Sequence, residues 1–354
     1  MSIYRDSKRI VGTNADRIGT DAISGGWKEV GRTTLGSAGD TIDVTSLPDK
    51  RYYMVLHNSI STGNVTSSVR LNGDSGNNYA WRYNDNGGSD GTITTNNAMN
   101  AGDRNPPTGG DAWAVSYLAN TSGKEKLMIS SGLQRNSAGA GSAPTRGETA
   151  SKWTGTDVID QITSVNQESG DWASGSEMVV LGWDESDTHT DNFWEELANV
   201  ELSSSADFFS SGTITAKKYL WLQTYIKQAS PYSTGLQFNS DTANNYAYRY
   251  SGNGNSDATG TSTWKCAFNY SSLAGGGYFM NTFIINNASK EKLVIAHTTE
   301  NSSSGAGTAP NRIESTGKWT NTSDQITSIQ IRKESGAGGG QLQSGSFIKV
   351  WGSN

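Results

Sequence analysis

Apolar and polar residues alternate over short segments along most of the chain. Residues 161–165 and 325–329 mix apolar with polar side chains, and we interpret both as half-buried strands. Turn-forming residues separate such segments, as at Asn86-Gly87-Gly88 and Gly252-Asn253-Gly254. No long window keeps a helical period, so the pattern predicts an all-β protein. Further strands are predicted at residues 52–57, 126–129, 177–181, 219–224, 278–285, 292–296 and 347–351.

Nearly all of this pattern occurs twice. Residues 71–83 match residues 238–250 at an offset of 167, and residues 139–146 match residues 305–312 at an offset of 166. Residues 160–164 and 324–328 share the identical sequence Asp-Gln-Ile-Thr-Ser. Because order and offset hold over most of the length, the chain is expected to contain two copies of one folding unit.

The repeat sets the expected domain boundaries. Residues 1–25 form an N-terminal arm, residues 26–183 the first copy, residues 184–192 an acidic linker and residues 193–354 the second copy. Several short strands per copy favour two tandem homologous β-sandwich domains of jelly-roll-like type. Residues 26–183 are called the first half below, and residues 193–354 the second half.

Composition and charge exclude several classes of protein. The net charge is −6 and the pI about 5.2, without the basic face that a sequence-specific nucleic-acid binder needs. Cys266 is the single cysteine, so an intrachain disulfide is excluded. No apolar run reaches the roughly 18 residues of a membrane span, so none is predicted. The first residues lack the apolar stretch of a signal peptide, which predicts synthesis in a cytoplasm.

A repeated element, Asn-x-Asp-x-x-Asn-Asn-Tyr-Ala-x-Arg-Tyr, is the strongest local signal. Asn, Asp and Arg side chains beside aromatic rings can hold a sugar, because the rings stack while the amides bond hydroxyls. Asp and Asn oxygens on a tight loop can also hold Ca²⁺. The alternative is an Asx-rich turn whose side chains cap their own backbone. The candidate ligand-binding residues are Asp74, Asn77, Asn78, Trp81, Arg82, Asp241, Asn244, Asn245, Tyr248 and Arg249.

Catalytic signatures are missing from the sequence. Its three histidines show no metal-binding spacing, and no hydrolase motif is present. We therefore predict a non-enzymatic protein with no catalytic residue, no metal-ligand set and no resident cofactor. A polysaccharide-cleaving enzyme would need two carboxylates facing each other across a cleft, which a sequence alone does not reveal.

Two kinds of segment are candidates for assembly contacts. The arm carries Arg5, Lys8, Arg9 and Arg17, which are expected to tie subunits together. The paired Gly-Ala-Gly loops at residues 139–141 and 305–307 are expected to be flexible tips suited to contacts between subunits.

Residues 7–17, 35–40, 77–83 and 152–154 resemble repeat domains in virion structural proteins of environmental tailed phages and archaeal viruses. The resemblance implies a capsid, decoration, spike or fibre protein that forms a symmetric homo-oligomer and contacts other virion proteins. It implies location in the virion after synthesis in the host cytoplasm, and it brings no catalytic residues. The alternative is a pair of carbohydrate- or host-surface-binding modules, such as the receptor-binding part of a fibre, with a cell-surface glycan as partner.

Overall fold

The computed structural model describes residues 3–5, 8–11, 26–102, 110–184, 187, 191–267, 269–271, 276–301, 304–334 and 340–354. Throughout these ranges the regular secondary structure is β-strand, without any helix. A search of the same residues therefore finds no helix with the length and apolarity needed to cross a membrane. The predicted all-β fold class is confirmed.

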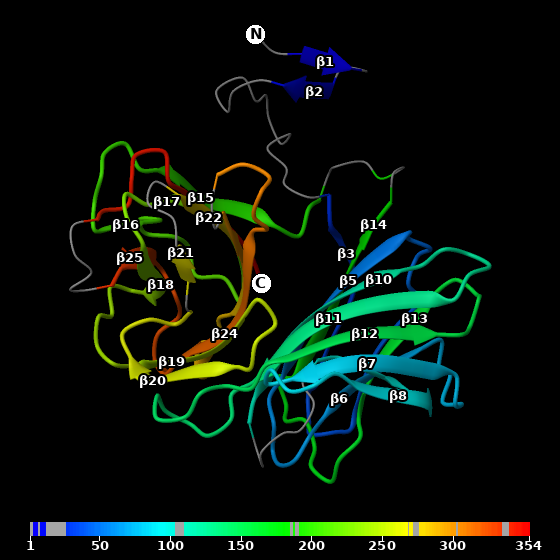
Figure 1. Cartoon of the computed structure of the whole chain (residues 1–354). Coiled ribbons are helices and arrows are strands. Elements are labelled where there is room, and N and C mark those ends of the chain that lie inside the picture. Colours follow the sequence, from blue (N-terminus) through cyan, green and yellow to red (C-terminus); the bar gives the residue numbers. More distant parts are fainter. Residues whose placement is uncertain are drawn as a thin grey trace.

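The first half is a β-sandwich of one large and one small sheet (Figure 1). Its eight-stranded sheet has the order β3-β14-β5-β10-β11-β12-β7-β8, and its four-stranded sheet the order β4-β13-β6-β9. The strands are β3 (Lys28–Thr34), β4 (Thr41–Thr45), β5 (Tyr52–Ser59), β6 (Ser67–Leu71), β7 (Tyr79–Asp85), β8 (Gly91–Asn96), β9 (Met99–Asn100), β10 (Ala112–Ala119), β11 (Lys126–Gln134), β12 (Gly147–Trp153), β13 (Gln161–Asn166) and β14 (Glu177–Trp183).

The second half repeats this order strand for strand: β15-β26-β17-β22-β23-β24-β19-β20 in the large sheet and β16-β25-β18-β21 in the small one. Its strands are β15 (Glu195–Glu201), β16 (Phe208–Ser210), β17 (Tyr219–Lys227), β18 (Tyr232–Phe238), β19 (Tyr246–Gly252), β20 (Ala258–Thr263), β21 (Asn269–Ser271), β22 (Gly277–Ile285), β23 (Lys292–Glu300), β24 (Asn311–Trp319), β25 (Ile329–Lys333) and β26 (Phe347–Ser353). A short hairpin of β1 (Ile3–Arg5) and β2 (Lys8–Val11) precedes both halves.

Each sandwich has a core between its two sheets. Because successive side chains on a strand point to opposite faces, alternate residues of each strand enter that core. In the first half Tyr53 and Val55 of β5 pack with Ile42 and Val44 of β4. In the second half the corresponding core is made by residues such as Leu220, Leu222, Leu236, Phe238 and Ile348.

One predicted strand is wrong. A strand was predicted at residues 325–329, but residues 325–328 precede β25, which runs from Ile329 to Lys333. The amide of Ile159 donates to the Asn120 side chain, and the amide of Ile326 does so to Asn286. Ile162 pairs with Leu71, and Ile329 with Phe238. Ile159 of the first half therefore corresponds to Ile326 of the second half, and Ile162 corresponds to Ile329; all four are fully buried. This structural alignment differs from the alignment of the two identical Asp-Gln-Ile-Thr-Ser sequences. The other predicted strands are confirmed.

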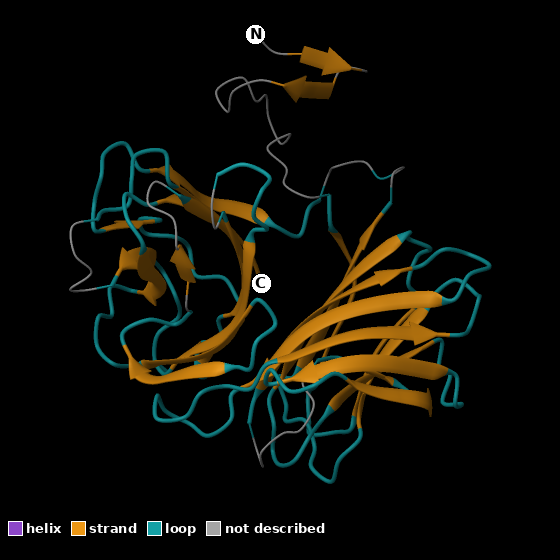
Figure 2. Ribbon diagram, viewed as in Figure 1, coloured by secondary structure: helices purple, strands orange, loops and turns teal. Residues whose placement is uncertain are grey.

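The two large sheets also pack against each other through their outer faces (Figure 2). A third apolar cluster combines Met54, Leu56 and Trp113 of the first half with Tyr219 and other residues of the second half. The rings of Trp113 and Tyr219 lie 5.6 Å apart. We call this contact region between the halves the seam. Its remaining buried members are Val115, Leu133, Val179, Leu181, Phe193, Trp194, Phe283, Ile285, Leu293, Ile295 and Trp351.

Candidate functional site

The repeated Asp/Asn loop of the first half is held together by its own residues. Oδ1 of Asp74 accepts a hydrogen bond of 2.8 Å from the Gly76 amide. Oδ2 of Asp74 accepts bonds of 2.9 Å from the Asn78 side chain and 2.7 Å from the Trp153 indole. The Tyr79 hydroxyl donates to the Asp74 carbonyl at 2.8 Å. Asp74 thus joins the loop to β12 through its carboxylate and to β7 through its backbone carbonyl.

The second half builds the same arrangement around Asp241. Its carboxylate accepts hydrogen bonds from the Ala243 amide at 3.0 Å, the Asn245 side chain at 2.9 Å and the Trp319 indole at 2.8 Å. The Tyr246 hydroxyl donates to the Asp241 carbonyl at 3.0 Å. Two copies with one bonding pattern indicate a loop whose polar groups stabilise the fold.

The pKa of Asp74 agrees with a role of this loop in stabilising the fold. Burial disfavours the charged form of Asp74, but hydrogen bonds from Trp153, Asn78 and the Gly76 amide outweigh it and lower the pKa of the carboxyl. Both carboxylate oxygens already have donors within the loop. Within the described ranges no group of three or more His, Cys, Asp or Glu side chains is placed to hold a metal ion. Ca²⁺ also takes Asn and backbone carbonyl oxygens as ligands, and Ca²⁺ binding at this loop stays an untested alternative.

The other candidate residues lie on different surfaces. Trp81 shares the core-side face of β7 with Tyr79, whereas Arg82 points to the outer face, where it lies 3.7 Å from Asp90. Tyr248 and Arg249 divide between the two faces of β19 in the same way. Asn77 and Asn244 are exposed on the loops. The ten residues do not converge on one pocket, and ligand binding by them stays a prediction.

Of the arm residues, Arg5 lies on β1 and Lys8 and Arg9 on β2. Arg17 lies outside the described residues. An assembly role for the arm stays a prediction.

The two Gly-Ala-Gly loops have different environments. The first loop lies in the seam: the Gly139 amide donates to Glu291 at 2.6 Å, and the Ala140 carbonyl accepts from the Ser262 amide at 2.7 Å. The second loop, described from residue 304, is exposed through residue 310. The first loop therefore contacts the other half of its own chain.

An ion pair next to the first loop is buried in the seam. Arg146 donates to Asp257 at 2.7 Å, and the two side chains are only 4% and 1% exposed. Arg249 lies 3.9 Å from Asp257 and donates to the Pro144 carbonyl at 2.9 Å. On the far side of the seam, Glu177 accepts from Lys218 at 2.9 Å and from the Tyr219 hydroxyl at 2.5 Å.

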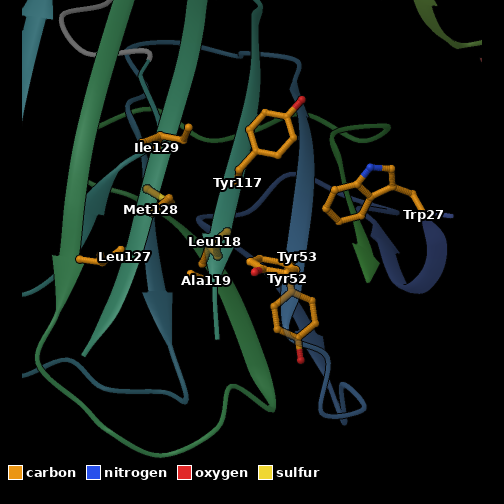
Figure 3. Close-up of a pocket in the computed structure, with 9 residues that line it drawn as sticks. All are labelled: Trp27, Tyr52, Tyr53, Tyr117, Leu118, Ala119, Leu127, Met128 and Ile129. Atoms are coloured by element: carbon orange, nitrogen blue, oxygen red, sulfur yellow. The ribbon is translucent and has the colours of Figure 1, made fainter. Parts of the chain in front are cut away.

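The outer face of the first large sheet continues beyond the seam as an open apolar surface (Figure 3). Trp27, Tyr52 of β5 and Tyr117 of β10 surround a pocket of about 350 Å³ together with Leu127 and Ile129 of β11. Tyr52 stacks on Trp183 with ring centroids 5.5 Å apart. We call these five residues, Trp27, Tyr52, Tyr117, Leu127 and Ile129, the open face.

The second half buries the residues at the same sheet positions. Leu127 and Ile129 are 58% and 61% exposed, whereas their counterparts Leu293 and Ile295 are 1% and 2% exposed within the seam. Tyr52, Tyr117 and Trp27 correspond to the buried Tyr219, Phe283 and Trp194. The open face is thus the copy, in the first half, of a surface that the second half uses for contact.

Sequence reasoning missed the open face. The available signal was the run Leu127-Met128-Ile129, which is apolar on both faces of a strand. Met128 is buried in the sandwich core, while its two neighbours point outward. A strand of this kind indicates a sheet that is covered on both sides.

A scan against protein-family models finds no match, and no curated protein matches the chain. Among solved structures, domains LG4-5 of the mouse laminin alpha1 chain are similar at 9% sequence identity and a TM-score of 0.20, covering 94% of this chain and 92% of that chain. An outer membrane channel from Pseudomonas putida F1 is similar at 12% identity and a TM-score of 0.13, covering 87% of this chain and 95% of that chain. The similarity is too low to indicate a function, so the function must be argued from the chain's own surfaces.

Proposed function

We propose that this protein is a structural component of a virus particle, and that it self-assembles into a symmetric oligomer. The observation that carries the assembly role is the open face. It exposes Leu127 and Ile129 where the repeated unit in the same chain buries Leu293 and Ile295. The location in a virion is supported by the resemblance of the repeats to virion structural proteins.

The chemistry of the open face favours a protein contact. Its residues are aromatic or aliphatic, and the polar groups on their side chains are the two Tyr hydroxyls and the indole N–H of Trp27. Exposed apolar surface of this kind is stabilised by burial, at about 25 cal/mol per Å². A rigid sandwich with apolar groups on both faces of its large sheet suits a building block of a particle.

Assembly of the purified full-length chain tests the proposal, by light scattering and negative-stain microscopy over a range of concentrations. We expect regular multimers, with shells, sheets or filaments indicating a building block and a discrete small oligomer indicating a spike, fibre or decoration protein. A parallel sample lacking residues 1–25 tests the arm. If the arm ties subunits together, this truncated sample should form smaller particles. A dispersed monomer at every concentration would contradict the proposal.

The alternative is glycan binding at the open face. The rings of Trp27 and Tyr117, 6.3 Å apart, favour it because aromatic rings stack on sugars. The apolar lining supplies few hydrogen-bonding groups for sugar hydroxyls, which favours assembly over this alternative. A glycan array probed with full-length protein separates the two: saturable binding that Trp27→Ala abolishes, with no oligomer formed, would support the glycan.

A further inference from the structure

The seam joins two unlike surfaces of the repeated unit. The first half contributes the loop at residues 135–146 and one end of its large sheet, including Trp113 and Val179. The second half contributes the opposite end of the same sheet, including Leu293 and Ile295. We call the first kind of surface the tail and the second kind the head. A contact between a head and a tail leaves one head and one tail free in each chain.

The free head belongs to the first half, and it consists of the open face together with its charged rim. In the seam, Asp257 and Arg249 of the second half's head meet Arg146 and Pro144 of the tail. The corresponding residues of the free head are Asp90 and Arg82, an exposed pair 3.7 Å apart.

A second ion pair is likewise buried in the seam in the second half, while its counterpart in the first half is partly exposed. Lys318 and Glu291, 3.7 Å apart, are buried in the seam, where Lys318 donates to the Arg135 carbonyl at 3.2 Å and Glu291 accepts from the Gly139 amide. Their counterparts Lys152 and Glu125 form a pair of 3.1 Å that is about half exposed. The free head therefore carries the same charged groups, already paired in the same way.

The free tail belongs to the second half. Its loop at residues 304–310 is exposed, and Arg312, the counterpart of Arg146, has a side chain that is 64% exposed. Phe279, the counterpart of Trp113, and Phe347 are also exposed. Arg312 lies 3.3 Å from Glu314 of its own strand, just as Arg146 lies 3.2 Å from Glu148 in addition to its seam partner Asp257.

Exposed apolar side chains gather on these two surfaces. Six large hydrophobic side chains are exposed among the described residues. Three lie on the free head (Tyr52, Leu127 and Ile129) and two on the free tail (Phe279 and Phe347), whereas Phe208 lies on neither. Since scattered surface hydrophobics need no explanation, this concentration is the informative feature.

We propose that the free head of one molecule binds the free tail of a second copy of the same chain, in the geometry of the seam. The second copy places residues 304–312, Phe279 and Phe347 against the open face, Asp90 and Glu125 of the first. The contact is heterologous, so it produces a closed ring or an open filament, depending on the rotation between neighbours. This inference rests on the proposed self-assembly and specifies the surfaces that carry it.

The contact between molecules is expected to be weaker than the seam. The free tail has Gln223 and Lys349 where the first half's tail has Leu56 and Val179, so its apolar area is smaller. The seam also joins two parts of one chain, which gives it a high effective concentration. Assembly should therefore depend on protein concentration.

Two variants of the full-length protein test the surfaces separately. Leu127→Asp places a charge on the free head, and Phe279→Asp places one on the free tail. Both positions are exposed on strands, and Phe208→Asp is a matched control outside both surfaces. Sedimentation velocity measures association, and thermal unfolding confirms that each variant folds as the wild type does.

We expect each surface variant to weaken self-association at least about tenfold, while Phe208→Asp associates like the wild type. An equimolar mixture of the two surface variants should form dimers that grow no further, because each partner keeps one intact surface. Wild-type association that both surface variants retain would overturn the inference and leave the proposed assembly function standing. Loss of association in both variants without recovery in the mixture would also overturn it, whereas a monomeric wild type would contradict both proposals.

Discussion

A buried histidine links the stability of the first half to pH. His57 of β5 lies beside the Trp172 ring, with 5.3 Å between ring centroids, and 3.3 Å from Ser164 Oγ. Complete burial disfavours the imidazolium and lowers the pKa of His57 to about 4. An unfolded chain has the ordinary histidine pKa of about 6.5. Between these values the unfolded chain binds more protons, so the free energy of unfolding falls as the pH drops.

Replacing His57 by the residue at the same position of the second half tests this link. In His57→Thr, which copies Thr224, the histidine contribution disappears. Between pH 6.5 and pH 4 we expect the wild type to lose about 3 kcal/mol more of its free energy of unfolding than the variant. Urea denaturation at a series of pH values measures the difference. Parallel pH profiles would show that His57 is readily protonated in the folded protein.

The Asp74 carboxylate offers a test of the loop that the sequence suggested as a ligand site. Asp74→Ala removes the acceptor of the Trp153 indole and leaves that donor unpaired at a mostly buried ring. We expect a loss of about 1–3 kcal/mol of stability, and no change in the exposed neighbour variant Asn77→Ala. Chemical denaturation with and without Ca²⁺ provides the measurement. Stabilisation of the wild type by Ca²⁺ that Asp74→Ala lacks would support the metal-site interpretation.

The equivalent hairpins β7–β8 and β19–β20 differ in the surroundings of their turn glycines. The turns at Asn86-Gly87 and Asn253-Gly254 both have positive φ at each residue, as tight turns between strands require. A Cβ at Gly87 would lie 2.4 Å from the backbone nitrogen of Asp257 across the seam. A Cβ at Gly254 would meet only the end of the flexible Arg312 side chain, at 3.2 Å.

Alanine substitutions at these two glycines therefore separate backbone strain from the seam contact. Gly254→Ala should cost about 1–2 kcal/mol because of its positive φ. Gly87→Ala carries the same strain and also displaces Asp257, so we expect a clearly larger loss. Thermal denaturation of both variants provides the comparison. Equal losses would mean that the turn at Gly87 makes no close contact with the second half.

Apolar patterning and turn residues identified eight of the 26 strands among the described residues, namely β5, β11, β13, β14, β17, β22, β23 and β26, because strands with a buried face carry their apolar residues visibly in the sequence. Register was harder to predict. The identical Asp-Gln-Ile-Thr-Ser sequences suggested one match, but in the structure Ile329 pairs with Phe238 and β25 begins there, after residues 325–328. The repeated motif drew attention to the loop around Asp74, but its hydrogen bond from Trp153 depends on a strand residue that is 79 positions away.

The arrangement of the halves could not be read from local pattern. The repeat indicated two copies, but the packing of large sheets through their outer faces depends on which apolar residues on β11 and β23 find a partner. Leu127 and Leu293 occupy the same position in nearly the same local sequence, Lys-Glu-Lys-Leu, yet one is exposed and the other buried. The difference arises from the single contact that each chain can make internally. The open face and the free tail are the surfaces that this internal contact leaves exposed.

Chemical cross-linking between two chains tests the repeated head-to-tail contact most directly. In the seam, Glu291 meets the loop at Gly139, so Glu125 of one molecule should lie beside the equivalent loop of its neighbour. One chain carries Glu125→Cys and the other Ala306→Cys, while the native Cys266 is buried. We predict that a short bis-maleimide joins the two chains in the mixture, and that it does not join a Glu125→Cys chain to a Phe208→Cys chain. Assembled protein in which both mixtures cross-link equally, or neither does, would contradict the account.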